Sequence, residues 1–186
     1  MILIAIFSFI FLLMCVVQYN QLIRVKNNVD NAYGALDAAL QQRYDMIPNL
    51  VAVIQQYSAY EKDTLEGVVK LRVRACDSGT ISPDEKLKLD RELSTNLGKL
   101  MVNVESYPDL KASANFQHLQ RSLNEVEAQI AASRRAYNAT ITEYNNAIQT
   151  FPGNMFASAM EMRPKNVLSI PQADRNNIDV RKHFQQ

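Results

Sequence analysis

The first 17 residues constrain the fold of this chain most, because they read MILIAIFSFIFLLMCVV and carry no charged side chain. Ser8 is their one polar side chain. As a helix this run would reach about 26 Å, slightly short of a hydrocarbon core of about 30 Å. Tyr19 would then lie at the membrane interface, which suits an amphipathic ring. We therefore expect residues 1–17 to anchor the protein in a lipid bilayer.

Two other uses of an apolar N-terminal run fit this one less well. A cleaved secretory signal normally has a basic start and small residues before the cut, and this chain has neither. A lipoprotein would use Cys15, but Met14 stands where a small residue is needed. We interpret the run as an uncleaved, single-pass anchor.

The charges that flank the anchor predict its orientation. Arg24 and Lys26 follow it closely, whereas only the α-amino group precedes it. Basic residues close to a membrane helix tend to remain on the cytoplasmic side. The C-terminal domain is therefore expected in the cytoplasm.

Composition favours helices and argues against nucleic acid as a partner. Lys and Arg number 20 against 19 acidic residues, so the chain lacks the basic excess of a nucleic-acid surface. Five Gly, six Pro and no Trp, in a chain rich in Ala, Leu, Gln, Asn and Lys, are typical of long helices. Cys15 and Cys76 are too few and too far apart for a disulfide framework. We expect an all-α protein.

Helical periodicity begins directly after the anchor. Apolar residues recur every three or four positions from Leu22 to Ile47, and again from Leu50 to Ala75. Pro48 separates the two runs. We interpret Pro48 as a turn, which gives four helices; a kink there would give three long rods. In the first case Asp45 would cap the helix that follows Pro48.

The segment DSGTISPDEK, residues 77–86, is the clearest break in the chain. Gly79 suits a helix end, and Pro83 suits the first position of the next helix. Ser82 and Glu85 have the spacing of a capping box. A third helix is therefore expected from about residue 83.

Two further breaks complete the predicted fold. The third helix should run to Tyr107, where Pro108 stops it, and Asn115 should cap the fourth helix over residues 116–151. The fourth helix has the alternating threes and fours of a coiled coil. Short connections between long amphipathic helices predict an antiparallel, up-and-down four-helix bundle.

The chain thus divides into an anchor, a bundle and a C-terminal part. These parts are residues 1–17, residues 18–152, and residues 153–186, which hold a short amphipathic segment and an irregular tail. The segment FPGNMFASAMEM, residues 151–162, could form a short helix with Phe156, Ala159 and Met160 on one side. It would either rest on the bilayer surface or cap the open end of the bundle.

Five stretches give the chain a family resemblance. They are YNQL at residues 19–22, RYDMIPNLV at 43–51, YPDLKASANFQHLQ at 107–120, RRAYNATITEYNNAI at 134–148 and FP at 151–152. In these stretches the chain resembles the LemA family, a group of bacterial membrane-anchored helical proteins. The resemblance covers about residues 17–157.

The resemblance implies one membrane helix followed by a four-helix bundle, in the inner (cytoplasmic) membrane of a bacterium. It implies no established catalytic activity and no cofactor. Relatives include proteins of the magnetosome membrane, and family members often accompany genes for membrane zinc metalloproteases. The chain departs from the family at its end, where a short Gly-Phe-Lys-Pro segment would be usual and MRPKNVLSIPQADRNNIDVRKHFQQ stands instead.

The sequence offers little for catalysis or metal binding. The two histidines, His118 and His183, each lack a second ligand four residues on. The chain has no glycine-rich phosphate loop and no serine elbow. We expect no catalytic residues, no metal site and no cofactor, and thus no enzyme; a hydrolase would require a cleft with a strongly perturbed acid or base.

Charged residues on or beside the apolar helix faces are the remaining candidates for a site. This candidate polar cluster comprises Arg43, Asp45, Glu61, Glu127, Arg134 and Arg135. We favour the interpretation that these charges pair across the bundle and fix helix register. In the alternative, Arg43, Asp45, Glu127 and Arg134 line a polar groove that binds a small molecule or peptide.

Tyr19, Tyr137 and Tyr144 are each followed by Asn. The simplest interpretation places the tyrosines in the core, with their hydroxyls at its edge and the asparagines on the polar side. An aromatic recognition patch is the alternative.

Together these features predict a non-enzymatic, membrane-anchored scaffold or adaptor that recruits or organises membrane proteins. Its expected partners are the lipid bilayer, through residues 1–17, and other membrane proteins, including a membrane metalloprotease or a second copy of the chain. The alternative is a sensor bundle that binds a small molecule or peptide.

Overall fold

The computed structural model describes residues 1–57, 62–76, 82–104 and 106–168. In these ranges every regular element is a helix, so the all-α prediction is confirmed. The helices are α1 (Ile2–Gln55), α2 (Lys62–Cys76), α3 (Pro83–Val104), α4 (Pro108–Ala112), α5 (Ala114–Gln149) and α6 (Gly153–Ala159).

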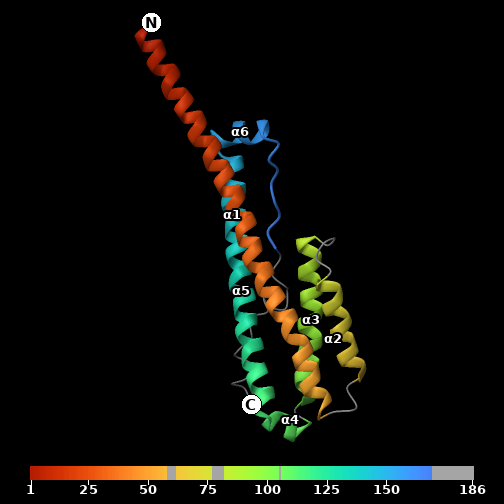
Figure 1. Cartoon of the computed structure of the whole chain (residues 1–186). Helices are drawn as coiled ribbons and strands as arrows, with labels where there is room; N and C mark the ends of the chain where they lie inside the picture. Colours follow the sequence, from red (N-terminus) through yellow and green to blue (C-terminus); the bar gives the residue numbers. More distant parts are fainter. Residues whose placement is uncertain (58–61, 77–81, 105, 169–186) are drawn as a thin grey trace, which may run out of the picture.

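The longest helix, α1, joins the apolar N-terminus to the packed domain without a break (Figure 1). Its 54 residues correspond to about 80 Å of helix. Its N-terminal part is long and apolar enough to cross a membrane and is not buried against the protein. Burial begins at Leu22, which is 1% exposed.

The other long helices cover α1 along different parts of its length (Figure 1). Helix α5 runs antiparallel to α1, while α2 and α3 form a hairpin beside the C-terminal half of α1. Helix α5 buries residues three, four or seven positions apart, which is one helix face. They are Phe116, Leu123, Val126, Ile130, Tyr137, Ile141, Tyr144 and Ile148.

The predicted turn at Pro48 is wrong, because α1 continues through Pro48 to Gln55. Leu50 and Ile54 are buried on the same stripe as Tyr44 and Ile47. Packing on both sides of the proline therefore stabilises the continuous helix. The chain reverses after Gln55 instead. Residues 58–61 lie outside the described part.

The predicted start of α3 agrees with the structure, whereas the predicted end of α3 and the predicted cap of α5 differ from it. At α3, Pro83 is the first helical residue and the amide of Glu85 donates to Ser82 Oγ at 3.3 Å, as a capping box requires. Helix α3 ends at Val104 rather than at Tyr107, and Pro108 begins the short α4 instead of stopping α3. The N-cap of α5 is Ser113, not Asn115.

Helix α6 lies across α1 at the end of the domain nearest the apolar N-terminus (Figure 1). It buries Gly153 and Ala157, and Phe156 and Met160 pack against the core. A side chain at Gly153 would collide with the carbonyl oxygen of Ala147, so glycine is what allows this close approach. Of the two alternatives for this segment, the contacts of Phe156 and Met160 with the core agree with a short helix that caps the open end of the bundle.

After α6 the chain runs back along α5 (Figure 1), and we name residues 163–168 the strap. Asn145 exchanges two hydrogen bonds with the backbone of Lys165, at 2.8 and 2.9 Å. Asn138 does the same with Leu168, at 3.0 and 2.8 Å. Seven residues of helix span about 10 Å, as do three residues of extended chain, so the two spacings match.

The strap gives the asparagines of two Tyr-Asn pairs a role that their sequence alone did not indicate. Tyr137 and Tyr144 are buried, as the core interpretation expects, but that interpretation is wrong for Tyr19, which is 51% exposed. The hydroxyl of Tyr144 donates to the carbonyl of Arg163 at 3.1 Å. The tail was expected to be irregular, and the strap is indeed not helical. Residues 169–186 lie outside the described part.

Candidate functional site

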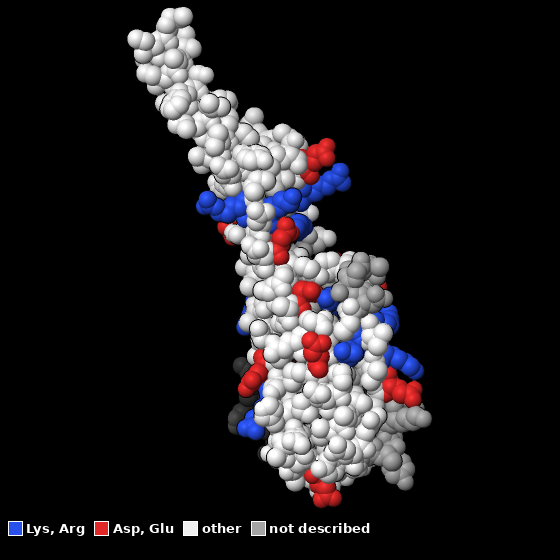
Figure 2. Space-filling model, viewed as in Figure 1, with Lys and Arg blue, Asp and Glu red and all other residues white. Residues whose placement is uncertain are grey.

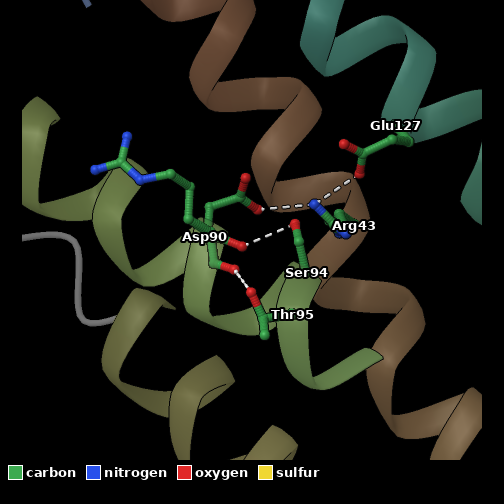
Figure 3. A network of polar contacts seen from close by, with 6 residues as sticks. Arg43, Asp90, Ser94, Thr95 and Glu127 are labelled. Atoms are coloured by element: carbon green, nitrogen blue, oxygen red, sulfur yellow. Dashed lines mark hydrogen bonds and ion pairs between the residues drawn. The ribbon is translucent and has the colours of Figure 1, made fainter. Parts of the chain in front are cut away.

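Three helices meet at the guanidinium of Arg43 (Figure 3). One nitrogen of Arg43 in α1 lies 3.1 Å from Asp90 Oδ1 in α3 and 2.9 Å from Glu127 Oε2 in α5. Arg43 and Asp90 are each 6% exposed, whereas the side chain of Glu127 is 55% exposed. The network therefore has a buried half and a half that faces solvent.

Opposing effects act on the pKa of the buried carboxyl of Asp90. Burial raises the pKa of Asp90, Arg43 acts to lower it, and Glu127 raises it further. Arg43 is thus the group that keeps a charged carboxylate acceptable inside the protein. Removing one partner of such a buried pair leaves an uncompensated charge and costs about 3–5 kcal/mol.

A second ion pair joins the same two helices. Lys86 of α3 is 3% exposed in its side chain and contacts Asp37 of α1 through Nζ and Oδ1. Asp37 lies six residues before Arg43, and Lys86 lies four residues before Asp90. The α3 face that meets α1 therefore carries two charged side chains. Their ion pairs with α1 fix the axial position of α3 relative to α1.

Pro48 creates a third connection, between α1 and α2. Proline has no backbone N–H, so the carbonyl of Tyr44, four residues earlier, lacks its usual helical donor. Arg72 of α2 supplies a donor instead, from Nε at 2.9 Å. The proline that was expected to end a helix thus provides an acceptor for the neighbouring helix.

Asp45 does not cap a helix, because it lies inside α1. It accepts a hydrogen bond from Gln41 at 2.8 Å and lies 4.0 Å from Arg72 Nη2. The side chain of Asp45 is 60% exposed. Asp45 therefore contacts the α2 side of α1, away from the Arg43–Asp90 pair.

The side chain of Tyr44 lies in the core between these connections. Tyr44 is 0% exposed, and no described residue hydrogen-bonds to its hydroxyl. Burial, then the nearby carboxylate of Asp90, raise its pKa. Tyr44 is thus a neutral phenol at physiological pH.

A surface groove of about 270 Å³ opens beside the network, between α3 and α5. It is lined by Asp90, Arg91, Ser94, Thr95, Glu127, Ile130, Ala131 and Arg134. Ser94 and Thr95 donate their hydroxyls to carbonyls one turn earlier in α3 (Figure 3). The groove combines guanidinium and carboxylate groups, so it could hold a polar ligand by charge and hydrogen bonding.

The structure distributes the candidate polar cluster unevenly. Arg43 and Glu127 are bonded, Arg134 lines the groove with Glu127, and Asp45 lies elsewhere. Arg135 is exposed and does not line the groove. Glu61 lies outside the described residues. In the described ranges, no group of three or more His, Cys, Asp or Glu could hold a metal ion.

Sequence reasoning missed Asp90, Lys86 and Arg72. A signal for Asp90 was present, because the apolar stripe of α3 skips from Leu87 to Leu93 and Asp90 fills the missing position. Its burial follows from that position. Arg72 carried no comparable signal, since its acceptor is a carbonyl freed 28 residues away.

Comparison with known proteins gives the same family over most of the chain. The model of the LemA family matches residues 32–181. A protein named Protein LemA from Metamycoplasma hominis is 25% identical over 171 residues, covering 92% of this chain and 78% of that protein.

Magnetosome proteins are also similar. Magnetosome protein MamQ 2 of Paramagnetospirillum magneticum is 23% identical, over 79% of this chain and 63% of the relative. Magnetosome protein MamQ of Magnetospirillum gryphiswaldense is 22% identical with the same coverage. The chain therefore spans less than two thirds of the length of these two relatives.

Proposed function

Because the chain belongs to the LemA family and its apolar segment continues into the longest helix of the folded domain, we propose that it is a membrane-anchored, non-enzymatic scaffold. It would recruit or organise other membrane proteins. The observation that carries this proposal is the unbroken α1. An anchor without a linker presents the domain in one orientation, as a scaffold requires.

The reach of α1 supports this proposal. Residues 18–55 would extend about 57 Å from the bilayer if they stood upright on it. The α2–α3 hairpin packs only on the far half of this length (Figure 1). Partner surfaces on the hairpin would therefore lie at a set height above the membrane.

The hairpin carries exposed apolar side chains that a partner could cover. Val69 and Val73 of α2 are 38% and 57% exposed, and Val102 of α3 is 69% exposed. Contact with another protein would remove this surface from water. Proposed partners are a second copy of the chain and other membrane proteins, including a membrane metalloprotease.

Photo-crosslinking in cells tests the scaffold. A photoreactive residue replaces Val73, and the matched control carries it at Lys70 on the same helix, whose side chain is 76% exposed. We expect crosslinks from position 73 to a membrane protein or a second copy, and fewer from position 70. A strict monomer that forms no crosslink and purifies alone in detergent would contradict the proposal.

We further propose that the domain lies in the cytoplasm, with the anchor in a bacterial inner membrane. Arg24 and Lys26, just beyond the apolar run, support this side. In a chain with Cys15 and Cys76 changed to Ser, a cysteine at Glu66 should react with an impermeant maleimide only after lysis. Labelling of intact cells would place the domain outside.

The groove between α3 and α5 supports a second candidate function, a sensor of a small polar molecule or peptide. Arg134→Met would remove one of the two arginines that line the groove, and Arg135→Met, one residue on and outside it, is the matched control. We expect mass spectrometry of the purified proteins to find a co-purified ligand in wild type and Arg135→Met only. Normal folding with no ligand in any of the three would exclude this candidate.

A further inference from the structure

We propose that the end of the domain nearest the anchor binds the surface of an anionic phospholipid bilayer. The surface consists of Phe151 and Met155 together with Arg24, Lys26, Arg163 and Lys165, and we call it the α6 face. It would add a second membrane contact to that of the anchor. The proposal does not depend on the scaffold function.

The position of α6 along α1 gives the first argument. A Cβ at Gly153 would lie 3.9 Å from Leu22, so α6 meets α1 at that residue. Leu22 follows Val17, the end of the apolar run, by five residues, or about 7.5 Å of helix. The polar headgroup layer is about 5–8 Å thick on each side of the hydrocarbon core. Helix α6 therefore lies at the level of the headgroups.

The distribution of apolar side chains around α6 gives the second argument. Gly153 and Ala157 face the domain, where Phe156 also packs against the core. Two other large apolar side chains face solvent: Phe151, just before α6, is 76% exposed, and Met155 is 65% exposed. A soluble domain would place its large apolar groups inward, whereas a segment at a bilayer surface directs them into the interface.

Charge supplies the third argument, and it selects an anionic surface. Arg24 lines a surface groove of about 420 Å³, and Lys26, Arg163 and Lys165 line another of about 410 Å³ beside α6. Figure 2 shows Lys and Arg side chains gathered in a band between the uncharged N-terminal helix and the rest of the domain. Each basic group near an anionic membrane contributes attraction to it.

Most of these cations are available for headgroups. Lys165 lies 3.5 Å from Asp30 and is partly neutralised. Among the described residues, no carboxylate lies within ion-pair distance of Arg24, Lys26 or Arg163. Glu143 offsets Arg24 in the first groove, whereas Glu161 faces three cations in the second, which therefore stays net positive.

The strap explains how two of the cations reach this position. Asn145 binds the backbone of Lys165, and Tyr144 binds the carbonyl of Arg163. These bonds hold both residues next to Lys26 of α1. The anchor keeps the whole face beside the bilayer, so even weak individual contacts form at high effective concentration.

The chain contains no tryptophan, which permits a direct test with single-tryptophan variants. Phe151→Trp places the fluorophore on the α6 face, and Tyr57→Trp, at a 42% exposed site beyond the end of α1, is the matched control. The full chain is reconstituted in nanodiscs of phosphatidylcholine, with or without one third phosphatidylglycerol, with brominated acyl chains as quencher. We expect at least about twofold stronger quenching at position 151 than at position 57.

The charge contribution is tested in the Phe151→Trp background. Quenching should increase with phosphatidylglycerol and decrease with salt, and replacing Arg24, Lys26 and Arg163 by Gln should abolish both effects. Replacing the exposed Lys70, Arg74 and Arg121 by Gln is the control and should leave both unchanged. Equal quenching at positions 151 and 57 would overturn the membrane contact. Quenching that ignores phosphatidylglycerol would overturn headgroup recognition, and crosslinks from the hairpin would be unaffected by either result.

Discussion

At the scale of single residues, the stretch RYDMIPNLV contributes two different groups to the contacts between helices. Arg43 acts through its guanidinium, which two carboxylates share. Tyr44 acts through its backbone carbonyl, which is available because Pro48 has no N–H. The same stretch that best marks the family thus connects α1 to each of the other three long helices.

The first prediction concerns Arg43→Met, which would leave Asp90 buried without its counter-charge. We expect the free energy of unfolding in detergent to fall by about 3–5 kcal/mol. The exposed Arg135→Met should change it by less than about 0.5 kcal/mol. Adding Asp90→Leu to Arg43→Met removes the orphaned charge and should restore most of the loss. If the double variant were no more stable than the single one, the buried charge would not be the cause.

The second prediction concerns pH and Asp90. Because burial raises the pKa of Asp90 above its unfolded value, the folded state holds the proton more tightly. The contribution of Asp90 to stability must then decline as pH rises from about 3.9, the unfolded value, through the raised pKa. We expect the unfolding free energy of wild type, minus that of Asp90→Asn, to decrease across this window. Equilibrium unfolding at several pH values measures it, and a constant difference would contradict the assignment.

At the scale of helices, most faces were readable from the sequence, but their ends and connections were not. Apolar spacing located the buried stripes of α1 and α5. The prediction at Pro48 was wrong because it relied on local helix propensity, which favours a break at proline. In the structure Leu50 and Ile54 continue the buried stripe, and Arg72 donates to the carbonyl that the proline leaves free. The buried half of the site at Asp90 was detectable only as a gap in the stripe of α3, and the strap left no periodic signal at all.

The third prediction tests the coupling between Pro48 and Arg72. Arg72→Leu should destabilise the wild-type domain by about 1–2 kcal/mol, because it leaves the carbonyl of Tyr44 without a donor. In a Pro48→Ala background the new backbone N–H can occupy that carbonyl, so Arg72→Leu should cost much less. A double-mutant cycle measures the difference. Arg74→Leu, exposed on the same helix, should show no coupling, and additive effects for Arg72 would refute the arrangement.

The fourth prediction tests the strap by hydrogen exchange. Asn145→Ala removes the acceptor of the Lys165 amide, and Asn138→Ala removes that of the Leu168 amide. Each substitution should accelerate exchange of its own amide by about tenfold, the equivalent of roughly 1.4 kcal/mol. Asn146→Ala, exposed beside Asn145, should change neither amide. Alanine favours helix, so α5 itself should stay intact; unchanged exchange in all three variants would exclude the strap.

At the scale of the whole molecule, the proposed anchor, the long α1 and the proposed α6 face would all act on one property, the orientation of the domain. Helix α1 passes from its exposed apolar part into the core without a hinge. Helix α6 lies across α1 where the core begins (Figure 1). The proposed partner surfaces on α2 and α3 lie at the opposite end. A domain held in this way would meet its partners at a fixed height and angle.

The fifth prediction separates orientation from simple tethering. Gln18→Gly with Tyr19→Pro should break α1 between the anchor and Leu22, since an internal proline costs a helix about 3 kcal/mol or more. Adding Phe151→Ser should weaken the second contact, at the α6 face. The domain should still fold, because its core begins at Leu22, and circular dichroism and membrane fractionation check this.

Crosslinks from position 73 should nevertheless fall several-fold relative to a control with Gln18→Ala and Tyr19→Ala, because a freely rotating domain no longer presents α2 at one height. Undiminished crosslinks would mean that the anchor serves only to keep the domain near the membrane.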